Sequence, residues 1–590
     1  MVREVAVHCG GSKSKRSRRS EPTLVELQLS GPDRNVNLII TDVTERMAAN
    51  IPDVFQDLVE LASYIYAADQ AVPRGDADAF QTGNPWRRSF KFFVPVRNPD
   101  LWASAEIREL LKDVLLFITD DEYDFTFDPL REHPPFEQFF DFAPGEMTGP
   151  IDEVVLFSGG LDSLAGVVHE GVVAERRVAL VSHRPVPKTD SKQQDLLDRV
   201  RPRCKHPPLP VPVWVNKSSQ LSRDYSQRTR SFLYASLAAT VARMLDLNRI
   251  RFYENGVTSW NLPVSEQLTS AKASRTTHPQ TLSKLTAFFE ALTQSAFSID
   301  NPLLWKTKAE VVNEINRAGC GDLIKYSVSC QHTIAQSAEH PHCGRCFQCV
   351  GRRFVALASD CPEHDPAQKY KVDLLTGARP AKIDRTLAES FYRTYVQMGS
   401  MTDLSFFSNY GEANRALTKP VLNHLSRTVD QVASGILDLH RRQSSDVLGV
   451  MRNAFAAYAG EIVRGQLPET CLIVLALPEN YRTAGVQTSA EQQLGRGPAK
   501  QATAEPTGKF HYSKRDERVY LQVLKLCQNV NAFEVWTDSE LLRRIQKHRH
   551  TDSELKGRSD FALRACFTRI RDRKGFQRSR AMRNIGKPPP

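Results

Sequence analysis

The fold class follows from the stretch Val154-Val155-Leu156-Phe157-Ser158-Gly159-Gly160-Leu161-Asp162-Ser163. Its first four residues form a short apolar run, which is typical of a strand buried on both faces of a parallel sheet. The two glycines permit a sharp turn and a close approach of the backbone to a ligand. Because we expect a helix to begin at Leu161, its first N–H groups and the positive end of its dipole face that turn. The stretch therefore predicts a strand–loop–helix unit that binds phosphate.

The segments that follow repeat this alternation of buried strand and helix. We expect further strands at 178–181, 211–215 and 249–253, and helices at 161–170, 193–200 and 232–245. Short apolar runs separated by helices are typical of βαβ units. The predicted fold class is therefore α/β, with a doubly wound parallel sheet.

The rest of the chain divides by its patterns, because 590 residues are too many for one core. Residues 21–150 mix strand and helix signals, and a stretch poor in large apolar residues marks a linker. The predicted organisation is a basic disordered arm at 1–20, an N-terminal α+β domain at 21–150, the nucleotide-binding domain at 151–380, a helical region at 381–482, a linker at 483–508 and a basic helical module at 509–590.

Basic residues concentrate at the two ends of the chain, whose net charge is +10. Residues 507–590 carry 20 Lys and Arg against 9 Asp and Glu, interleaved with Phe561, Phe567 and Phe576. Such a combination suits a nucleic-acid-binding module. It equally suits a solvated face or a surface that docks an acidic partner, so contact of residues 509–590 with nucleic acid is one of several alternatives.

Cysteine usage and hydropathy bear on the compartment. The cysteines number 11, an odd count, and three of them fall within seven residues. A reducing cytosol and a metal cluster fit this distribution better than a disulfide scaffold does. No apolar run reaches the ~18–20 residues that cross a bilayer, and the N-terminus lacks the apolar stretch of a signal peptide. We therefore expect a cytoplasmic protein that does not enter a membrane.

The turn after Phe157 carries side chains suited to a nucleotide phosphate. The hydroxyls of Ser158 and Ser163 are placed to donate hydrogen bonds to phosphate oxygens. Asp162 would repel a bare phosphate, so we expect Mg²⁺ to neutralise the pyrophosphate of bound ATP. No lysine follows the glycines, which argues against a Walker A loop. The residues expected to bind the nucleotide here are Phe157, Ser158, Gly159, Gly160, Leu161, Asp162 and Ser163.

A second motif is the run Cys343-Gly344-Arg345-Cys346-Phe347-Gln348-Cys349, with Cys330 thirteen positions upstream. Four thiolates close a tetrahedral Zn²⁺ shell and leave no open position, so we predict a structural zinc site at Cys330, Cys343, Cys346 and Cys349. Two alternatives stay open for the ligands. A histidine could replace one cysteine (His332, His340 or His342), or Cys320 could be a ligand. An iron–sulfur cluster is the competing cofactor.

The Ser-Gly-Gly-x-Asp-Ser loop resembles the signature of the PP-loop ATP pyrophosphatases, which have an adenine nucleotide alpha hydrolase-like fold. Together with the cysteine cluster it resembles the 7-cyano-7-deazaguanine synthase family of the queuosine pathway. The resemblance covers about residues 150–360. It extends to Thr229–Ala239, Glu254–Val257, His278–Gln280, Asn301–Glu310 and Arg352.

The resemblance implies an ATP-dependent ligase that forms carbon–nitrogen bonds. In that family, ATP adenylates the carboxylate of 7-carboxy-7-deazaguanine, ammonia displaces AMP to give an amide, and a second ATP leads to the nitrile. Lys308 and Arg230 would meet phosphate or acyl-adenylate charge, and Asn255 and Trp305 would contact the deazapurine. The implied catalytic residues are Ser158, Asp162, Ser163, Lys308 and Arg230, and the cofactor-binding residues beyond the loop are His183, Asn255 and Gly256.

The chain also departs from that family. Ser182-His183-Arg184-Pro185 stands where the family usually has an Asp-Tyr-Gly-Gln-like segment, and Thr229 replaces a glycine before Arg230. The chain is much longer than the simple enzymes of the family. Long versions resemble proteins of bacterial antiphage defence gene clusters, which implies protein partners and a protein or nucleic acid as acceptor.

Two alternatives of other kinds stay open at the level of sequence. The first is a PP-loop enzyme that modifies tRNA by sulfur transfer or amidation. The second is a catalytically inactive nucleotide-binding scaffold of a defence complex.

Overall fold

The computed structural model describes residues 2–12, 23–43, 51–74, 86–131, 140–142, 149–184, 187–224, 226–263, 275–330, 332, 336–478, 563 and 567. The chain divides into two compact units, residues 1–494 and 495–590, and the division falls within the interval expected to be a linker. The linker expected at 483–508 lies outside the described residues. So does the module expected at 509–590, apart from Leu563 and Phe567, which are helical and buried.

The central sheet has seven strands within the described residues, in the order β11-β10-β7-β8-β9-β3-β6. All neighbours are parallel except β3 and β9, which are antiparallel. The strands are β3 (Val36–Val43), β6 (Phe140–Phe142), β7 (Glu153–Leu156), β8 (Val178–His183), β9 (Leu209–Lys217), β10 (Arg249–Arg251) and β11 (Ser298–Asp300). The predicted α/β class is confirmed, and each strand expected after residue 150 is present.

Helices cover both faces of this sheet, as the side chains of β7 show. Val154 and Leu156 join the core that contains α7, whereas Val155 joins the core that contains α5 and α10. Such alternation buries the strand on both sides and explains its continuous apolar run. The covering helices are α5 (Leu161–Val167), which continues as a π-helical turn over Val168–Val173, α6 (Pro187–Val200), α7 (Arg230–Met244), α9 (Pro279–Thr293) and α10 (Lys308–Arg317).

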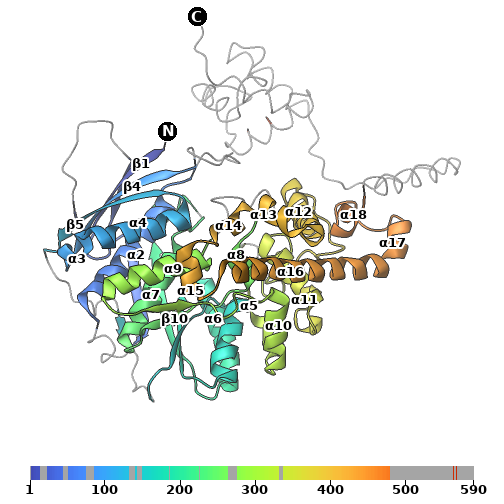
Figure 1. Cartoon of the computed structure of the whole chain (residues 1–590), viewed down its shortest axis with the longest axis horizontal. Helices are drawn as coiled ribbons and strands as arrows, with labels where there is room; N and C mark the ends of the chain where they lie inside the picture. The colour runs from blue at the N-terminus through green and yellow to red at the C-terminus, as the bar shows by residue number, and fades with distance from the viewer. Residues whose placement is uncertain are drawn as a thin grey trace, which may run out of the picture. The chain divides into compact units, whose positions relative to one another are not determined.

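A second sheet is formed by strands from the first 130 residues, which also contain β3 of the central sheet, and its strands are drawn in blue in Figure 1. Its four described strands are parallel, in the order β2-β1-β4-β5. They are β1 (Arg3–Cys9), β2 (Thr23–Leu27), β4 (Arg88–Val96) and β5 (Glu122–Pro129), accompanied by α2 (Asp53–Ala71), α3 (Pro99–Ala103) and α4 (Ala105–Thr119). Because α2 packs on α7 and α4 packs on α9, these helices form two layers between the sheets.

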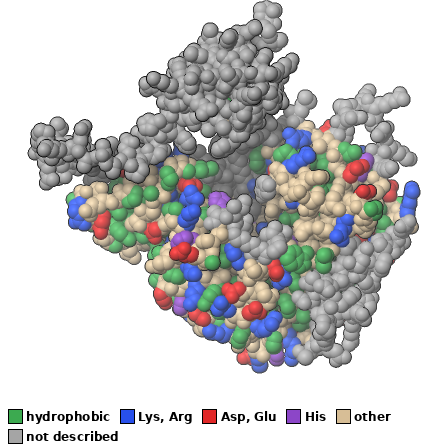
Figure 2. Space-filling model, turned by 180° about the vertical axis from the view of Figure 1, so that it is seen from behind, with side chains coloured by type: hydrophobic (Ala, Val, Ile, Leu, Met, Phe, Trp, Pro, Cys, Tyr) green, Lys and Arg blue, Asp and Glu red, His purple; other side chains and the backbone are tan. Residues whose placement is uncertain are grey.

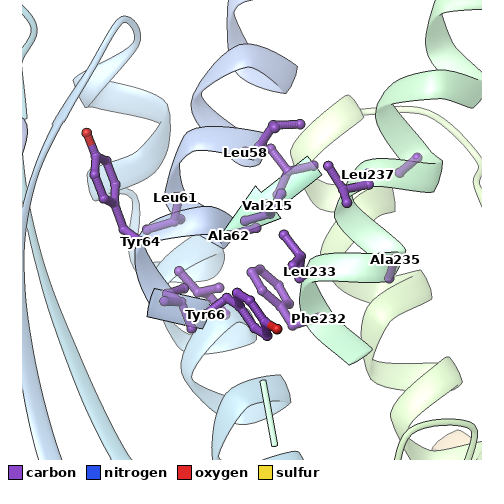
Figure 3. Packing of buried hydrophobic residues seen from close by; sticks show 14 of the residues in the cluster. Leu58, Leu61, Ala62, Tyr64, Tyr66, Val215, Phe232, Leu233, Ala235 and Leu237 are labelled. Carbon is purple, nitrogen blue, oxygen red and sulfur yellow. The ribbon is translucent and has the colours of Figure 1, made fainter. Parts of the chain in front are cut away.

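Figure 3 shows how the two layers meet. Leu58 and Ala62 of α2 lie on one side, Leu233 and Leu237 of α7 lie on the other, and Val215 of β9 lies between them. All five side chains are almost fully buried. One hydrophobic core therefore runs from the first sheet to the central sheet.

Two expectations for the N-terminal region were wrong. Residues Arg3–Cys9, expected in a disordered arm, form β1, because Val5, Val7 and Cys9 alternate into the core. The boundary expected at residue 150 does not separate two bodies, because β3 and β6 pair within the central sheet. An alternating pattern indicates that one face of a strand is buried, but it carries no information about which sheet the strand joins.

The region expected to be helical, 381–482, is helical as far as the structure describes it. Its helices are α12 (Lys382–Ser400), α13 (Asp403–Asn409), α14 (Gly411–Arg415), α15 (Lys419–Leu425), α16 (Val429–Ala457), α17 (Ala459–Val463) and α18 (Leu472–Ala476). The long helix α16 begins with a capping box between Thr428 and Gln431. It packs against α8 (Gly256–Trp260), α10 and α11 (Phe347–Ala358) of the preceding domain.

The described surface is mixed in character. Figure 2 shows acidic, basic and apolar side chains interspersed over the visible described face. No helix among the described residues is both long and apolar enough to span a membrane.

The contact between α8 and α16 generates a test of the fold. A Cβ atom at Gly256 would lie 2.0 Å from the carbonyl oxygen of Leu304 and 2.7 Å from Cδ2 of Leu439. We expect Gly256→Ala to lower the free energy of unfolding by about 3 kcal/mol or more, because backbone must move. The control is Gly449→Ala in α16, where the added Cβ would have no described atom within 4 Å apart from its two neighbours in the chain and the nearby backbone of its own helix. Alanine there should stabilise the helix by about 0.5–1 kcal/mol. Equal urea midpoints for the two variants would contradict the packing.

Candidate nucleotide site and cysteine cluster

The expected phosphate loop is a turn between β7 and α5 whose geometry requires glycine. Gly159 has φ +78°, in the left-handed region. A Cβ there would also lie 3.0 Å from Cγ of Gln193. The carbonyl of Gly159 accepts a hydrogen bond of 3.0 Å from the N–H of Val328, and Gly160 caps α5. The turn is therefore held from two sides, by α6 and by the segment that leads to Cys330.

The two serines of the loop lie side by side. The hydroxyl of Ser158 is 3.3 Å from that of Ser163, which also donates to the carbonyl of Gly160 over 2.9 Å. By contrast, the side chains of Phe157 and Leu161 are buried in the core. Phe157 and Leu161, both expected to bind the nucleotide, therefore have only their backbone to offer to a ligand.

Asp162 forms a buried ion pair with Lys308. Its Oδ2 lies 2.5 Å from Nζ of Lys308, and its Oδ1 accepts from the backbone N–H of Asn255 at 3.2 Å and from its Nδ2 at 3.0 Å. Burial opposes ionisation, but the charge of Lys308 outweighs it and lowers the pKa of Asp162. Burial, and then the charge of Asp162, raise the pKa of the neighbouring Glu254 well above its usual value. The charges of Lys308 and Asp162 therefore neutralise each other, and the carboxyl group of Glu254 stays protonated.

A second group of side chains surrounds Arg230 at the start of α7. Its Nε donates to the hydroxyl of Tyr234 over 3.0 Å, and its guanidinium lies 5.0 Å from the centroid of that ring. The ring of His183, at the end of β8, makes edge contacts with Tyr234 and with Tyr66 of α2, each with centroids 5.4 Å apart. Within the described residues, no carboxylate is bonded to the Arg230 guanidinium, so its charge is available to an anion.

His183 offers a buried hydrogen-bond acceptor. Burial and the charge of Arg230 lower its pKa to about 3, so the ring is neutral at physiological pH. Nε2 lies 2.8 Å from the carbonyl oxygen of Val215, which can only accept, so Nε2 carries the proton. Nδ1 is then an acceptor, and among the described residues it has no partner.

Gln193 connects the two groups. Its amide nitrogen donates to the carbonyls of Ser158, at 3.2 Å, and of His183, at 3.4 Å. Both partners are acceptors, which fixes the orientation of the amide. Its Oε1 is buried and has no partner in the described part of the chain. His183 at the end of β8 and Gln193 in α6 thus present two acceptors beside the loop that have no partner among the described residues.

The structure brings most of the expected site residues together and gives several of them contacts within the protein. Ser158, Ser163, Asp162, Lys308 and Asn255 meet around the loop, and Arg230 and His183 meet beside it. Asn255 holds Asp162 and caps α8. Gly256 allows close packing beneath Leu304. Trp305 packs on Trp260, with centroids 5.2 Å apart, and under Arg427, at 4.6 Å.

Sequence reasoning missed Glu254, Gln193, Tyr234 and Tyr66 as members of the site. Glu254 directly precedes Asn255 at the end of an expected strand, and that position was the available signal. Tyr66 lies far upstream in a helix of buried residues. No local pattern distinguishes it from its neighbours.

The four cysteines form one buried cluster, with their Sγ atoms all within 4.8 Å of one another. A tetrahedral zinc shell with Zn–S bonds near 2.3 Å places its sulfurs about 3.8 Å apart, and Sγ of Cys343 lies 3.8 Å from Sγ of Cys349. Backbone N–H groups of Arg345 and Cys346 point to Sγ of Cys343. The donor set and its spacing fit a metal ion.

The alternative ligands do not join this cluster. Cys320 belongs to the core around α5 and α10, and His332 is exposed. His340 is bonded through Nδ1 to the carbonyl of Gln368. The ring of His342 stacks on Tyr370, with centroids 4.8 Å apart. The described geometry thus gives the four-cysteine set alone.

The cluster also supports the turn at Gly159. The backbone N–H of Val328 donates to the carbonyl of Gly159, and Cys330 lies two residues further along the chain. Arg352 lies in α11, three residues after Cys349. It is buried and bonded to Asp365 and to the carbonyls of Ser327 and Ile324. A metal ion at the cluster would therefore hold the segment that braces the loop.

Comparison with known protein families gives a match over part of the chain. Residues 224–358 match the family model described as queuosine biosynthesis protein QueC. The matched part runs from α7 to α11 and includes Arg230, Lys308 and the four cysteines, whereas the turn at Ser158 lies outside it. The match supports the resemblance on which the site was predicted. The comparison with curated proteins found no match.

The cluster generates a prediction about metal content. We expect the purified protein to hold about one zinc ion per chain, and Cys346→Ser to hold almost none, because a neutral hydroxyl is a poor replacement for a thiolate. Cys320→Ser is the matched control, since that cysteine is buried outside the cluster. Elemental analysis by mass spectrometry measures both. Iron with sulfide in place of zinc would favour the competing cofactor, and unchanged zinc in Cys346→Ser would contradict the ligand set.

Proposed function

We propose that this chain is an ATP-dependent ligase that adenylates a carboxylate of the 7-carboxy-7-deazaguanine type for attack by ammonia or another amine. The observation that carries the proposal is the buried pair of Asp162 and Lys308 beside a glycine turn at the start of α5. The family match over residues 224–358 supports the substrate class.

The proposed reaction has two steps. A carboxylate oxygen attacks the α-phosphorus of ATP, the bond to the β-phosphate oxygen breaks, and pyrophosphate leaves. The amine nitrogen then forms a bond to the carbonyl carbon, AMP leaves with the original carboxylate oxygen, and the amine loses a proton. A second ATP would activate the amide oxygen in the same way if the product is a nitrile.

The residues around the turn suit the first step. The N–H groups at the start of α5 and the hydroxyls of Ser158 and Ser163 would bind the terminal diphosphate. Lys308 would place its charge near the phosphorus that is attacked, where preorganised charge lowers the barrier most. Both oxygens of Asp162 are already bonded, so Mg²⁺ would be held mainly by the phosphates of ATP.

The side chains of Arg230, His183 and Gln193 suit recognition of the two substrates. Arg230, a cation whose described hydrogen-bond partner is the hydroxyl of Tyr234, would bind the carboxylate. Nδ1 of His183 and Oε1 of Gln193 would accept hydrogen bonds from an amino group such as that of adenine. An unpaired buried acceptor costs about 1–3 kcal/mol, which a ligand with N–H donors recovers.

The alternatives have less support. Sulfur transfer needs a reactive thiolate, yet burial raises the pKa of Cys204 to about 11, which makes it a poor nucleophile. A scaffold without activity has no need of a charge-balanced lysine beside its phosphate turn. We also propose a role in a defence system, with protein partners and with nucleic-acid contact through residues 509–590. This part rests on the resemblance of long chains of this kind to proteins of antiphage defence gene clusters.

The direct test is substrate-dependent cleavage of ATP. Release of AMP and pyrophosphate is measured with 7-carboxy-7-deazaguanine and ammonium, with tRNA, and with neither. We expect only the deazaguanine carboxylate to accelerate AMP formation. Acceleration by tRNA alone would favour the tRNA-modifying enzyme, and no acceleration by either would favour the scaffold.

Lys308 provides a residue-level prediction. We expect Lys308→Met to slow AMP formation by about 100-fold or more, because the charge acts on the transition state. Lys306→Met is the control, since Lys306 lies two residues away and is paired with Glu314 nearer the surface. The double variant Asp162→Asn/Lys308→Met removes both buried charges and should regain stability without activity. Full activity in Lys308→Met would contradict its role.

A further inference from the structure

A buried network of four charges ends at the site. Asp69, at the end of α2, is bonded through Oδ1 to Arg88 at 2.5 Å and to Arg74 at 3.1 Å. Asp121 completes the network with bonds of 2.6 Å to Arg74 and 2.7 Å to Arg88. All four side chains are at most 1% exposed. Such a network has one low-energy arrangement, because moving any member leaves a buried charge unpaired.

The second oxygen of Asp69 leaves this network and reaches α7. Oδ2 accepts from both the backbone N–H and the hydroxyl of Thr229, each at 3.1 Å. Thr229 is the residue that precedes α7, where the positive end of the helix dipole also favours a carboxylate. Burial would raise the pKa of Asp69, but Arg88 and Arg74 outweigh it and hold that pKa well below its usual range. Asp69 is thus ionised at every physiological pH.

Tyr66 lies one turn before Asp69 on the same face of α2. Its ring contacts His183, and burial raises the pKa of its hydroxyl to about 12, although the nearby charge of Arg230 works in the opposite direction. The phenol therefore stays protonated and polar beside Arg230. One face of α2 thus meets both the start of α7 and the side chains around Arg230.

We propose that Asp69 is a positioning residue that acts through Thr229 to hold Arg230 in place for an anionic substrate, so that the N-terminal region is a working part of the substrate site. The inference rests on the proposed function, because the anion is the carboxylate that is adenylated. Arg230 directly follows Thr229, so its backbone is fixed by the two bonds to Asp69. The role belongs to the carboxylate subsite and not to the phosphate turn.

The test distinguishes the effect of the Thr229 hydroxyl from the effect of the size of its side chain. Thr229→Val keeps the shape and the N–H bond but loses the hydroxyl bond, and Thr229→Ser restores it. The matched control is Thr240→Val in the same helix, whose buried hydroxyl donates to the carbonyl of Ser236. We expect Thr229→Val to raise KM for 7-carboxy-7-deazaguanine about tenfold, as loss of one hydrogen bond to a charged group predicts. KM for ATP should be unchanged, and Thr229→Ser and Thr240→Val should resemble the parent protein.

Binding of the same carboxylate, measured by calorimetry without ATP, keeps the test independent of turnover. If the parent protein forms no AMP yet binds the carboxylate, the proposed reaction fails, and a roughly tenfold weaker affinity in Thr229→Val than in Thr240→Val still supports the positioning role. Equal effects of the two valine variants would overturn it. So would an equal rise of both KM values, and so would a parent protein that does not bind the carboxylate.

Discussion

The buried ion pair between Asp162 and Lys308 joins three elements that are far apart in the sequence. Asp162 lies at the start of α5, Lys308 at the start of α10, and Asn255, which donates to Asp162, at the start of α8. Separating two buried charges is costly, so the ends of these helices keep a fixed position relative to the glycine turn at Gly159. The capping box of Thr307 and Glu310 orients Lys308, and Arg442 of α16 is bonded to Glu310 at 2.5 Å.

The regions outside the matched family domain converge on this arrangement. The C-terminal helical region contributes α16, which contacts α8 and α10. The N-terminal region contributes α2, which contacts α7 through a continuous core and through Asp69. The cysteine cluster braces the turn through the segment at Val328. The turn, Lys308 and Arg230 are thus each held by a different part of the chain. The regions outside the matched domain therefore all help to fix the positions of the site residues.

Local chemistry was readable from the sequence, and long-range pairing was not. The run before Ser158 and the two glycines identified the strand, the turn and the helix, because burial and backbone freedom are local properties. The spacing of Cys343, Cys346 and Cys349 identified the cluster for the same reason. That Asp162 is paired with Lys308, that β3 joins the central sheet and that Tyr66 reaches His183 depend on tertiary packing. No pattern within one segment contains that information.

The central claim is that a carboxylate oxygen of the substrate attacks the α-phosphorus of ATP held at the turn. It is tested most directly by labelling both carboxylate oxygens of 7-carboxy-7-deazaguanine with ¹⁸O and measuring, by mass spectrometry, the mass of the AMP formed in the presence of ammonium. The account predicts that each AMP carries one labelled oxygen, and that the second labelled oxygen stays in the amide unless a second ATP removes it to give the nitrile. Unlabelled AMP, or ADP in place of AMP, would contradict it.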